Sequence, residues 1–191
     1  LIISKEDPHH VLRELEWPTL FFFMGLFIIV GGVIKVGLIS NLSEGMISLT
    51  KPSAENMFVT AITTLWFSAV SSAIVDNIPF VASMIPLVID TAHAVLPSGT
   101  DFKSVVQHPT LMPVWWSLAL GACLGGNGSP VGASANVITL GLAEKAGYPI
   151  SFKKFIIYAI PITIETIIIA TIYIWLRYYF LHQSGIFISV R

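Results

Sequence analysis

The sequence has few charged residues and only one cysteine. Charged residues make up 11% of its 191 residues, whereas a soluble domain carries about 25%. Hydrophobic residues make up 54%, so the chain lacks the polar surface that a protein exposed to water on all sides needs. We therefore expect a membrane protein. The single cysteine, Cys123, excludes an internal disulfide and a cysteine-rich metal site.

The sequence also lacks the motifs of enzyme chemistry. It contains no HExxH metal motif, no nucleophile-base pair and no paired catalytic carboxylates. Its basic residues are scattered and its net charge is −1, which excludes the concentrated positive charge of a nucleic-acid-binding surface. We expect no enzymatic activity, no metal site, no cofactor and no nucleic-acid partner.

Apolar segments of membrane-spanning length alternate with short polar ones, since about 20 apolar residues cross the hydrocarbon core. The predicted class is an all-α membrane protein of polytopic helices. Polar loops are expected at 41–55 and 97–112. The other expected segments are an interfacial or loop segment at 1–17, a transmembrane helix at 18–40, a re-entrant helical hairpin at 56–96, a broken transmembrane helix at 113–147 and a transmembrane helix at 155–181.

The hairpin is predicted from two apolar arms, 56–75 and 80–96, that meet without an ordinary loop between them. They are joined at 76–79 by Asp-Asn-Ile-Pro. Asn77 is a good helix cap, and Pro79 suits the first turn of a following helix. One kinked helix running through Pro79 fits the same residues, because membrane helices tolerate proline.

Asp76 is the strongest single candidate for a functional residue. A carboxylate inside a membrane segment is costly unless it is paired, protonated or facing water, so it suggests a function by default. Asp76 can titrate or bind a cation, or it can cap the hairpin turn through the backbone. Asn77 has the same two interpretations, as an amide ligand to the substrate or as a cap.

A polar, glycine-rich stretch at 125–136 interrupts the other apolar region. Membranes tolerate unwound backbone only where protein buries it or where it lines a wet cavity, and broken helices mark the binding sites of transporters. Helix N-termini converging there favour an anion or a neutral solute, whereas exposed carbonyls could hold Na⁺. The simpler alternative is a packing kink. The expected binding residues here are Gly126, Asn127, Ser129, Ser134 and Asn136, and the expected structural residues are Gly125, Gly128, Pro130 and Gly132.

Glu165 lies in the middle of the last apolar segment, four residues after Pro161. We consider it a possible proton or cation site. The alternative is a neutral acid that is hydrogen-bonded to Thr163 or to a neighbouring helix.

Residues 72–80 and 125–137 together resemble the arsenite permease and sodium-proton antiporter branch of the ion transporter superfamily, and within it the P protein-like permeases. The resemblance implies two inverted repeats, of which this chain is similar to the C-terminal one. It implies that the 76–79 tip and the 125–136 break line a site completed by the N-terminal repeat. It further implies a homodimer in contact with membrane lipid, coupling to H⁺ or Na⁺, and the inner membrane of a prokaryote.

The expected function is secondary active transport of a small ion by alternating access, as Na⁺/H⁺ antiport or as an arsenite or anion permease. A passive anion channel, a citrate- or dicarboxylate-like symporter and a non-transporting module remain alternatives. Ser129-Pro130 stands where many P protein-like members have Thr-Leu, so the motif lies between branches and leaves the substrate open.

Overall fold

The computed structural model describes residues 35–53, 57–97 and 100–181, together with Phe21 and residues 24–25, 28–29 and 31–32. The predicted segment 1–17 and much of 18–40 lie outside the described residues. The described part is helical, as the all-α class predicts. That a hairpin re-enters the membrane, that a broken helix spans it, and that the chain is one repeat stay predictions.

Two parallel helices, α4 (Phe58–Ser72) and α7 (Met112–Gly125), form the centre of the bundle and share its most extensive helix contact. Hydroxyl side chains recur every fourth residue along the buried face of α4. They are Thr60, Thr64, Ser68 and Ser72. Small side chains let helix backbones approach closely, and the Ser72 hydroxyl also donates to the Ala122 carbonyl of α7 at 2.7 Å.

Two glycines of α7 allow this close approach. A Cβ atom on Gly121 would lie 2.4 Å from the Leu65 carbonyl oxygen, and one on Gly125 would lie 2.3 Å from the Ala69 carbonyl oxygen. No larger residue fits at either position while α4 stays in place. The close packing of α4 against α7 therefore depends on glycine at both positions of α7 as well as on the side chains between the helices.

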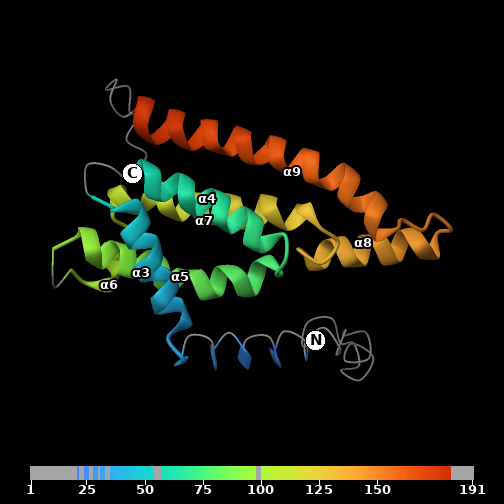
Figure 1. The fold of residues 1–191 in the computed structure, drawn as a ribbon, viewed down its shortest axis with the longest axis horizontal. Helices are drawn as coiled ribbons and strands as arrows, with labels where there is room; N and C mark the ends of the chain where they lie inside the picture. Colours follow the sequence, from blue (N-terminus) through green and yellow to red (C-terminus); the bar gives the residue numbers. More distant parts are fainter. Residues whose placement is uncertain are drawn as a thin grey trace, which may run out of the picture.

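Helix α5 (Asn77–Val95) follows α4 after a short turn and returns along the bundle (Figure 1). Its buried face, with Met84, Leu87 and Val88, packs into one apolar cluster with Leu111 and Leu118. The short helix α6 (Phe102–Val106) and the 3₁₀ turn η1 (Pro109–Leu111) then lead into α7.

After α7 come the 3₁₀ turn η2 (Gly126–Gly128), helix α8 (Ser134–Lys145) and the long helix α9 (Phe152–Trp175), which continues as the π-helical turn η3 (Leu176–Phe180). Helix α9 runs antiparallel to α4 across the bundle (Figure 1). The Trp66 indole donates to the Thr171 hydroxyl at 3.2 Å, and the ring of Phe58 meets that of Tyr179 edge to face at 4.9 Å.

The polar stretch 41–55 differs from its prediction as a loop, because α3 (Leu38–Thr50) is helical across most of it. Met46 and Thr50, one turn apart, are buried against the bundle. The Thr50 hydroxyl donates to the Met46 carbonyl at 2.8 Å. Tertiary packing of this face supports a helix that the polar composition did not indicate.

The expected loop 97–112 also contains helical structure. Asp101 caps α6, accepting hydrogen bonds from the Ser104 amide at 3.3 Å and the Ser104 hydroxyl at 2.5 Å. The bond from the hydroxyl is the main cause that lowers the pKa of the Asp101 carboxyl below its usual value.

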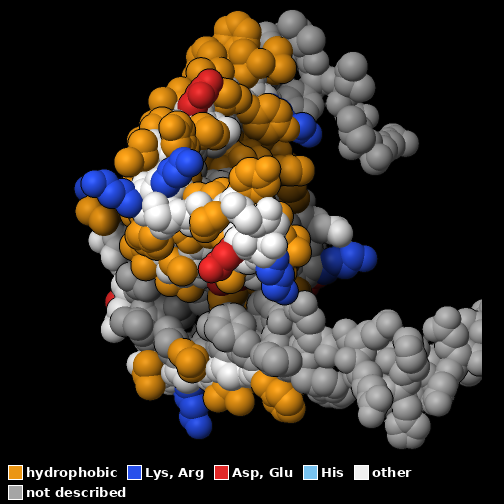
Figure 2. All heavy atoms as spheres, turned by 90° about the vertical axis from the view of Figure 1, so that its right-hand side faces the viewer, with side chains coloured by type: hydrophobic (Ala, Val, Ile, Leu, Met, Phe, Trp, Pro, Cys, Tyr) orange, Lys and Arg blue, Asp and Glu red, His pale blue; other side chains and the backbone are white. Residues whose placement is uncertain are grey.

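The described surface is largely apolar. Figure 2 shows hydrophobic side chains over most of the described part of one face, with charged side chains scattered among them. Two described helical segments, Asn77–Val95 and Phe152–Phe180, are long and apolar enough to cross a membrane. Only a small share of the second is buried inside the bundle, so most of it is available to lipid or to other protein.

The close approach of α4 and α7 is tested by Gly125→Ala. The added methyl group would collide with the Ala69 carbonyl, and overpacking of this kind costs about 1–3 kcal/mol. We expect a lower thermal unfolding temperature in detergent. Gly141→Ala in α8 is the matched control, since a Cβ there meets nothing within 4 Å and should stabilise the helix by about 0.5–1 kcal/mol. Equal unfolding temperatures for the two variants would contradict this packing.

Candidate functional site

Four helix ends meet at one end of the α4–α7 pair. Helix α4 ends at Ser72 and α5 begins at Asn77, while α7 ends at Gly125 and α8 begins at Ser134. Residues 73–76 and 126–133 are the two interruptions, and we call the region where they meet the junction. It brings the predicted 76–79 tip and the predicted 125–136 break together, although α8 already begins two residues before the predicted end of the break.

Asp76 holds the junction together by bonding to two helix N-termini. Its Oδ1 accepts from the Ile78 amide of α5 at 3.1 Å, and its Oδ2 accepts from the Ser134 amide of α8 at 2.9 Å. Residue Ala133 occupies the N-cap of α8 and has no side-chain oxygen. Helix α8 is therefore capped from another segment of the chain. The positive ends of two helices both favour a carboxylate at this place.

Ser129 ties the second interruption to the first. Its hydroxyl donates to the Ala73 carbonyl at 2.5 Å and accepts from the Gly132 amide at 3.1 Å. Because Ala73 follows the end of α4, this bond satisfies a carbonyl that the helix leaves without an internal partner. The Ser129 side chain thus has a structural task, beside any contact with a substrate.

Asn136 closes the interruption on itself. Its side-chain amide donates to the Gly126 and Ser129 carbonyls, each at 3.0 Å. The two carbonyls belong to the first residue of the η2 turn and to the residue that follows it, so one side chain fixes both ends of that turn relative to α8. The role of Asn136 as a binding residue stays a prediction, and in the structure its amide nitrogen holds the backbone.

The glycines of the junction are required by close contact between backbones. A Cβ on Gly132 would lie 2.6 Å from the Gly126 carbonyl oxygen and 2.7 Å from that of Ser72. A Cβ on Gly128 would lie 3.2 Å from the Ala73 Cβ. A positive φ is not the reason, since Gly37 and Gly147 are the described glycines that adopt one. Pro79 and Pro130 are both buried.

Three predicted binding residues keep free polar groups. Asn127 is exposed, while Asn77 and Ser134 are half-buried. The side-chain amides of Asn77 and Asn127 form no hydrogen bond with any described residue. The Ser134 hydroxyl also forms none, although the Ser134 backbone amide donates to Asp76. These groups are neutral donors and acceptors, which suit hydrogen bonding to a carboxylate or an oxyanion.

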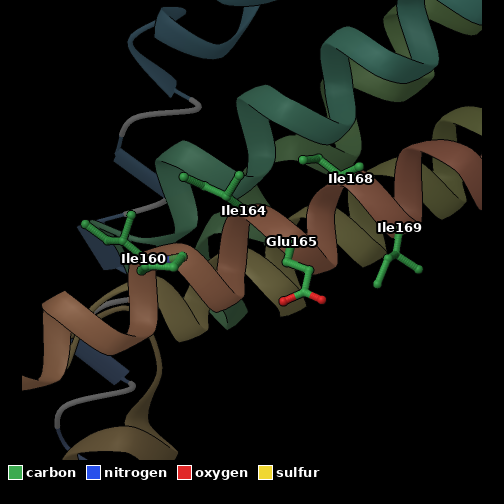
Figure 3. Close-up of a pocket in the computed structure, with 6 residues that line it drawn as sticks. Ile160, Ile164, Glu165, Ile168 and Ile169 are labelled. Carbon is green, nitrogen blue, oxygen red and sulfur yellow. The ribbon is translucent and has the colours of Figure 1, made fainter.

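Glu165 is not part of the junction. It lies on the outer face of α9, where an open hollow of about 490 Å³ is lined by Ile160, Pro161, Ile164, Ile168 and Ile169. Figure 3 shows Glu165 among these isoleucines. The hydrogen bond to Thr163, one of the alternatives for Glu165, does not form, since the Thr163 hydroxyl oxygen has no hydrogen-bond partner.

Thr163 of α9 reaches the junction, and the sequence reasoning did not assign it a role there. Its hydroxyl oxygen is buried without a hydrogen-bond partner and lies 3.7 Å from where a Cβ on Gly128 would be. Helix α9 is apolar on all sides, so its pattern did not indicate which face turns inward. Among the described residues, no cluster of three or more His, Cys, Asp or Glu side chains can hold a metal ion.

The structural role of Asn136 is tested by comparing Asn136→Ala with Asn127→Ala. The first substitution removes two hydrogen bonds of about 1 kcal/mol each, so we expect a lower unfolding temperature in detergent. The second removes a side chain without a described partner and should leave that temperature unchanged. Equal destabilisation by both would show that the η2 turn does not depend on Asn136.

Comparisons with known proteins agree with a role in transport. The sequence profile of the citrate transporter family matches residues 1–121, which is more than half of the chain. The match covers α4, the tip and α5, and it ends inside α7 before the glycine-rich interruption. No solved structure matches the chain.

Curated relatives match nearly the whole chain. An uncharacterised transporter of Mycobacterium tuberculosis is 42% identical over 181 residues, 95% of this chain and 39% of the relative. An uncharacterised transporter of a Synechocystis strain is 34% identical over 184 residues, 92% of this chain and 40% of the relative.

The human P protein is 36% identical over 176 residues, which is 91% of this chain and 20% of that protein. This chain therefore spans about two fifths or less of the length of these relatives. The profile match and the relatives named as transporters support a membrane transport protein. The chain belongs to the citrate transporter family.

Proposed function

We propose that the chain is part of a secondary active transporter, and that the junction forms one half of its substrate site. The observation that carries this proposal is the meeting of two helix interruptions in an otherwise apolar bundle. Broken helices with polar side chains are how transporters place binding groups within a membrane. The other half of the site would come from the remaining part of a longer protein, such as the N-terminal repeat that the resemblance implies.

A small organic carboxylate is the substrate class that we favour. The junction offers the neutral groups of Asn77, Asn127 and Ser134 to an anion. A coupling Na⁺ would need backbone carbonyls that are not already hydrogen-bonded, whereas a coupling H⁺ would need a titratable side chain. The citrate transporter match supports a carboxylate over arsenite. Sodium-proton antiport is the second candidate, favoured by the likeness of both motifs to the antiporter branch.

The two acidic residues differ in what they can contribute. Because both Asp76 oxygens already accept backbone amides, we propose that Asp76 positions the helix ends and does not bind the cargo. A carboxylate at the bilayer centre costs about 2.5–3.5 kcal/mol or more. Glu165 can therefore act as a proton site only if another part of the transporter, or a second copy in a homodimer, covers its face of α9.

The proposal is tested by uptake into proteoliposomes that contain the full-length protein. Labelled citrate, arsenite and Na⁺ are each supplied with imposed pH and Na⁺ gradients, one at a time. We expect gradient-driven, saturable accumulation of citrate. Sodium movement driven only by a pH gradient would identify an antiporter. Conductance without any coupling would indicate a channel and contradict the proposal.

The binding role of Asn127 is tested in the same assay. We expect Asn127→Ala to raise the citrate concentration for half-maximal uptake about tenfold, since one hydrogen bond to a charged group contributes about 1.5–3 kcal/mol. Its unfolding temperature should equal that of the unmodified protein. An unchanged concentration dependence would remove Asn127 from the site.

The role of Asp76 is tested by Asp76→Asn. The amide keeps one acceptor oxygen but loses the charge that faces both helix ends, and the loss of a cap costs about 0.5–2 kcal/mol. We expect a lower maximal rate of uptake and an unchanged shape of its pH dependence. If the variant instead loses the pH dependence of uptake at a normal maximal rate, Asp76 is the titrating, coupling residue.

A further inference from the structure

The end of α9 that lies far from the junction carries an arginine among aromatic rings. Arg177 belongs to the π-helical turn η3, and the centre of its guanidinium lies 5.5 Å from the ring of Tyr178, 5.7 Å from that of Tyr173 and 6.0 Å from that of Trp116. We call Arg177 and these three rings the arginine cluster. Single π-helical turns are rare and often occur at functional sites.

The hydrogen-bond partners of the Arg177 guanidinium among the described residues are neutral tyrosine hydroxyls. One of its nitrogens, Nη1, donates to the Tyr173 hydroxyl at 2.5 Å. No carboxylate among the described residues forms an ion pair with it, and the Arg177 side chain is exposed. An arginine presents five N–H donors in a planar fork that matches the oxygens of a phosphate. The cluster therefore displays an unpaired positive charge with a defined orientation.

The position near the end of α9 would place the cluster close to the lipid headgroups of a membrane that this helix crosses. The apolar segment Phe152–Phe180 has 29 residues, which is about 43 Å at 1.5 Å per residue, longer than the hydrocarbon core of about 30 Å. Lys153 and Lys154 lie at one end of this segment and Arg177 at the other. A membrane crossed by this segment would have the lysines near one polar edge and Arg177 near the other.

Exposed aromatic side chains surround the cluster, as expected at a membrane interface. Trp116 and Trp175 are 42% and 44% exposed, and Phe180 is 53% exposed. Helix α7 begins at Met112, one turn before Trp116 and directly after the 3₁₀ turn η1.

We propose that the arginine cluster binds the phosphate group of an anionic phospholipid. The guanidinium donors would hold the phosphate oxygens, and the exposed rings would pack against the glycerol and the first acyl carbons. The faces of Trp116, Tyr173 and Tyr178 already hold the guanidinium, so they do not offer a cage for the cationic headgroup of phosphatidylcholine. This distinguishes an anionic lipid from a zwitterionic one.

The proposal is tested by native mass spectrometry of the delipidated full-length protein. The protein is titrated with phosphatidylglycerol, with phosphatidylcholine and with inorganic phosphate. We expect phosphatidylglycerol to bind the unmodified protein, and Arg177→Gln to weaken that binding about tenfold, as for a hydrogen-bonded charge. Lys153→Gln, which removes an exposed cation at the opposite end of the same helix, should bind phosphatidylglycerol normally.

Arg177→Lys keeps the positive charge but loses the planar set of N–H donors of the guanidinium. It provides a second test in case Arg177→Gln does not fold. We expect its affinity for phosphatidylglycerol to lie between those of the unmodified protein and Arg177→Gln. Three results would overturn the proposal. The first is that Lys153→Gln lowers the affinity for phosphatidylglycerol as much as Arg177→Gln does. The second is that the unmodified protein binds phosphatidylglycerol and phosphatidylcholine with equal affinity. The third is that millimolar inorganic phosphate displaces phosphatidylglycerol, which would assign the cluster to free phosphate.

Discussion

The carboxylate of Asp76 is the constraint on which the junction depends. It caps α5 in the ordinary local way and caps α8 across 58 residues of sequence. A single side chain thereby sets the position of two helix N-termini relative to each other. Ser129 and Asn136 complete the arrangement by binding the carbonyls of the interruptions. Without a charge between the two helix ends, their positive poles would face one another.

The Asp76 carboxylate also affects which substrate the junction can bind. Converging helix N-termini alone favour an anion, but here Asp76 already neutralises both of them. The groups left for a substrate are the amides of Asn77 and Asn127 and the hydroxyl of Ser134. A carboxylate would then bind through neutral donors and through whatever the rest of a longer transporter contributes. The proposal thus separates the residues that hold the helix ends from those that would contact a substrate.

Much of this could be predicted from the sequence, and the remainder has identifiable causes. The Asp-Asn-Ile-Pro turn and the glycine-rich stretch were found because proline, glycine and polar residues stand out in an apolar chain. The cap on α8 could not be found, because Ala133 shows only that a local cap is missing and not which residue replaces it. The inward face of α9 was equally hidden, since its isoleucines surround both Thr163 and Glu165. Helix α3 was missed because its burial depends on tertiary contacts.

The most direct test of the central claim is whether a substrate covers the junction. A cysteine is placed at exposed Asn127 in the full-length protein with Cys123, which is itself exposed, replaced by serine. Its rate of labelling by a membrane-permeant maleimide is then measured with and without citrate, and a cysteine at Gly141 serves as the comparison. The account predicts that citrate slows labelling at position 127 and leaves position 141 unaffected. Equal labelling rates at position 127 with and without saturating citrate would contradict it.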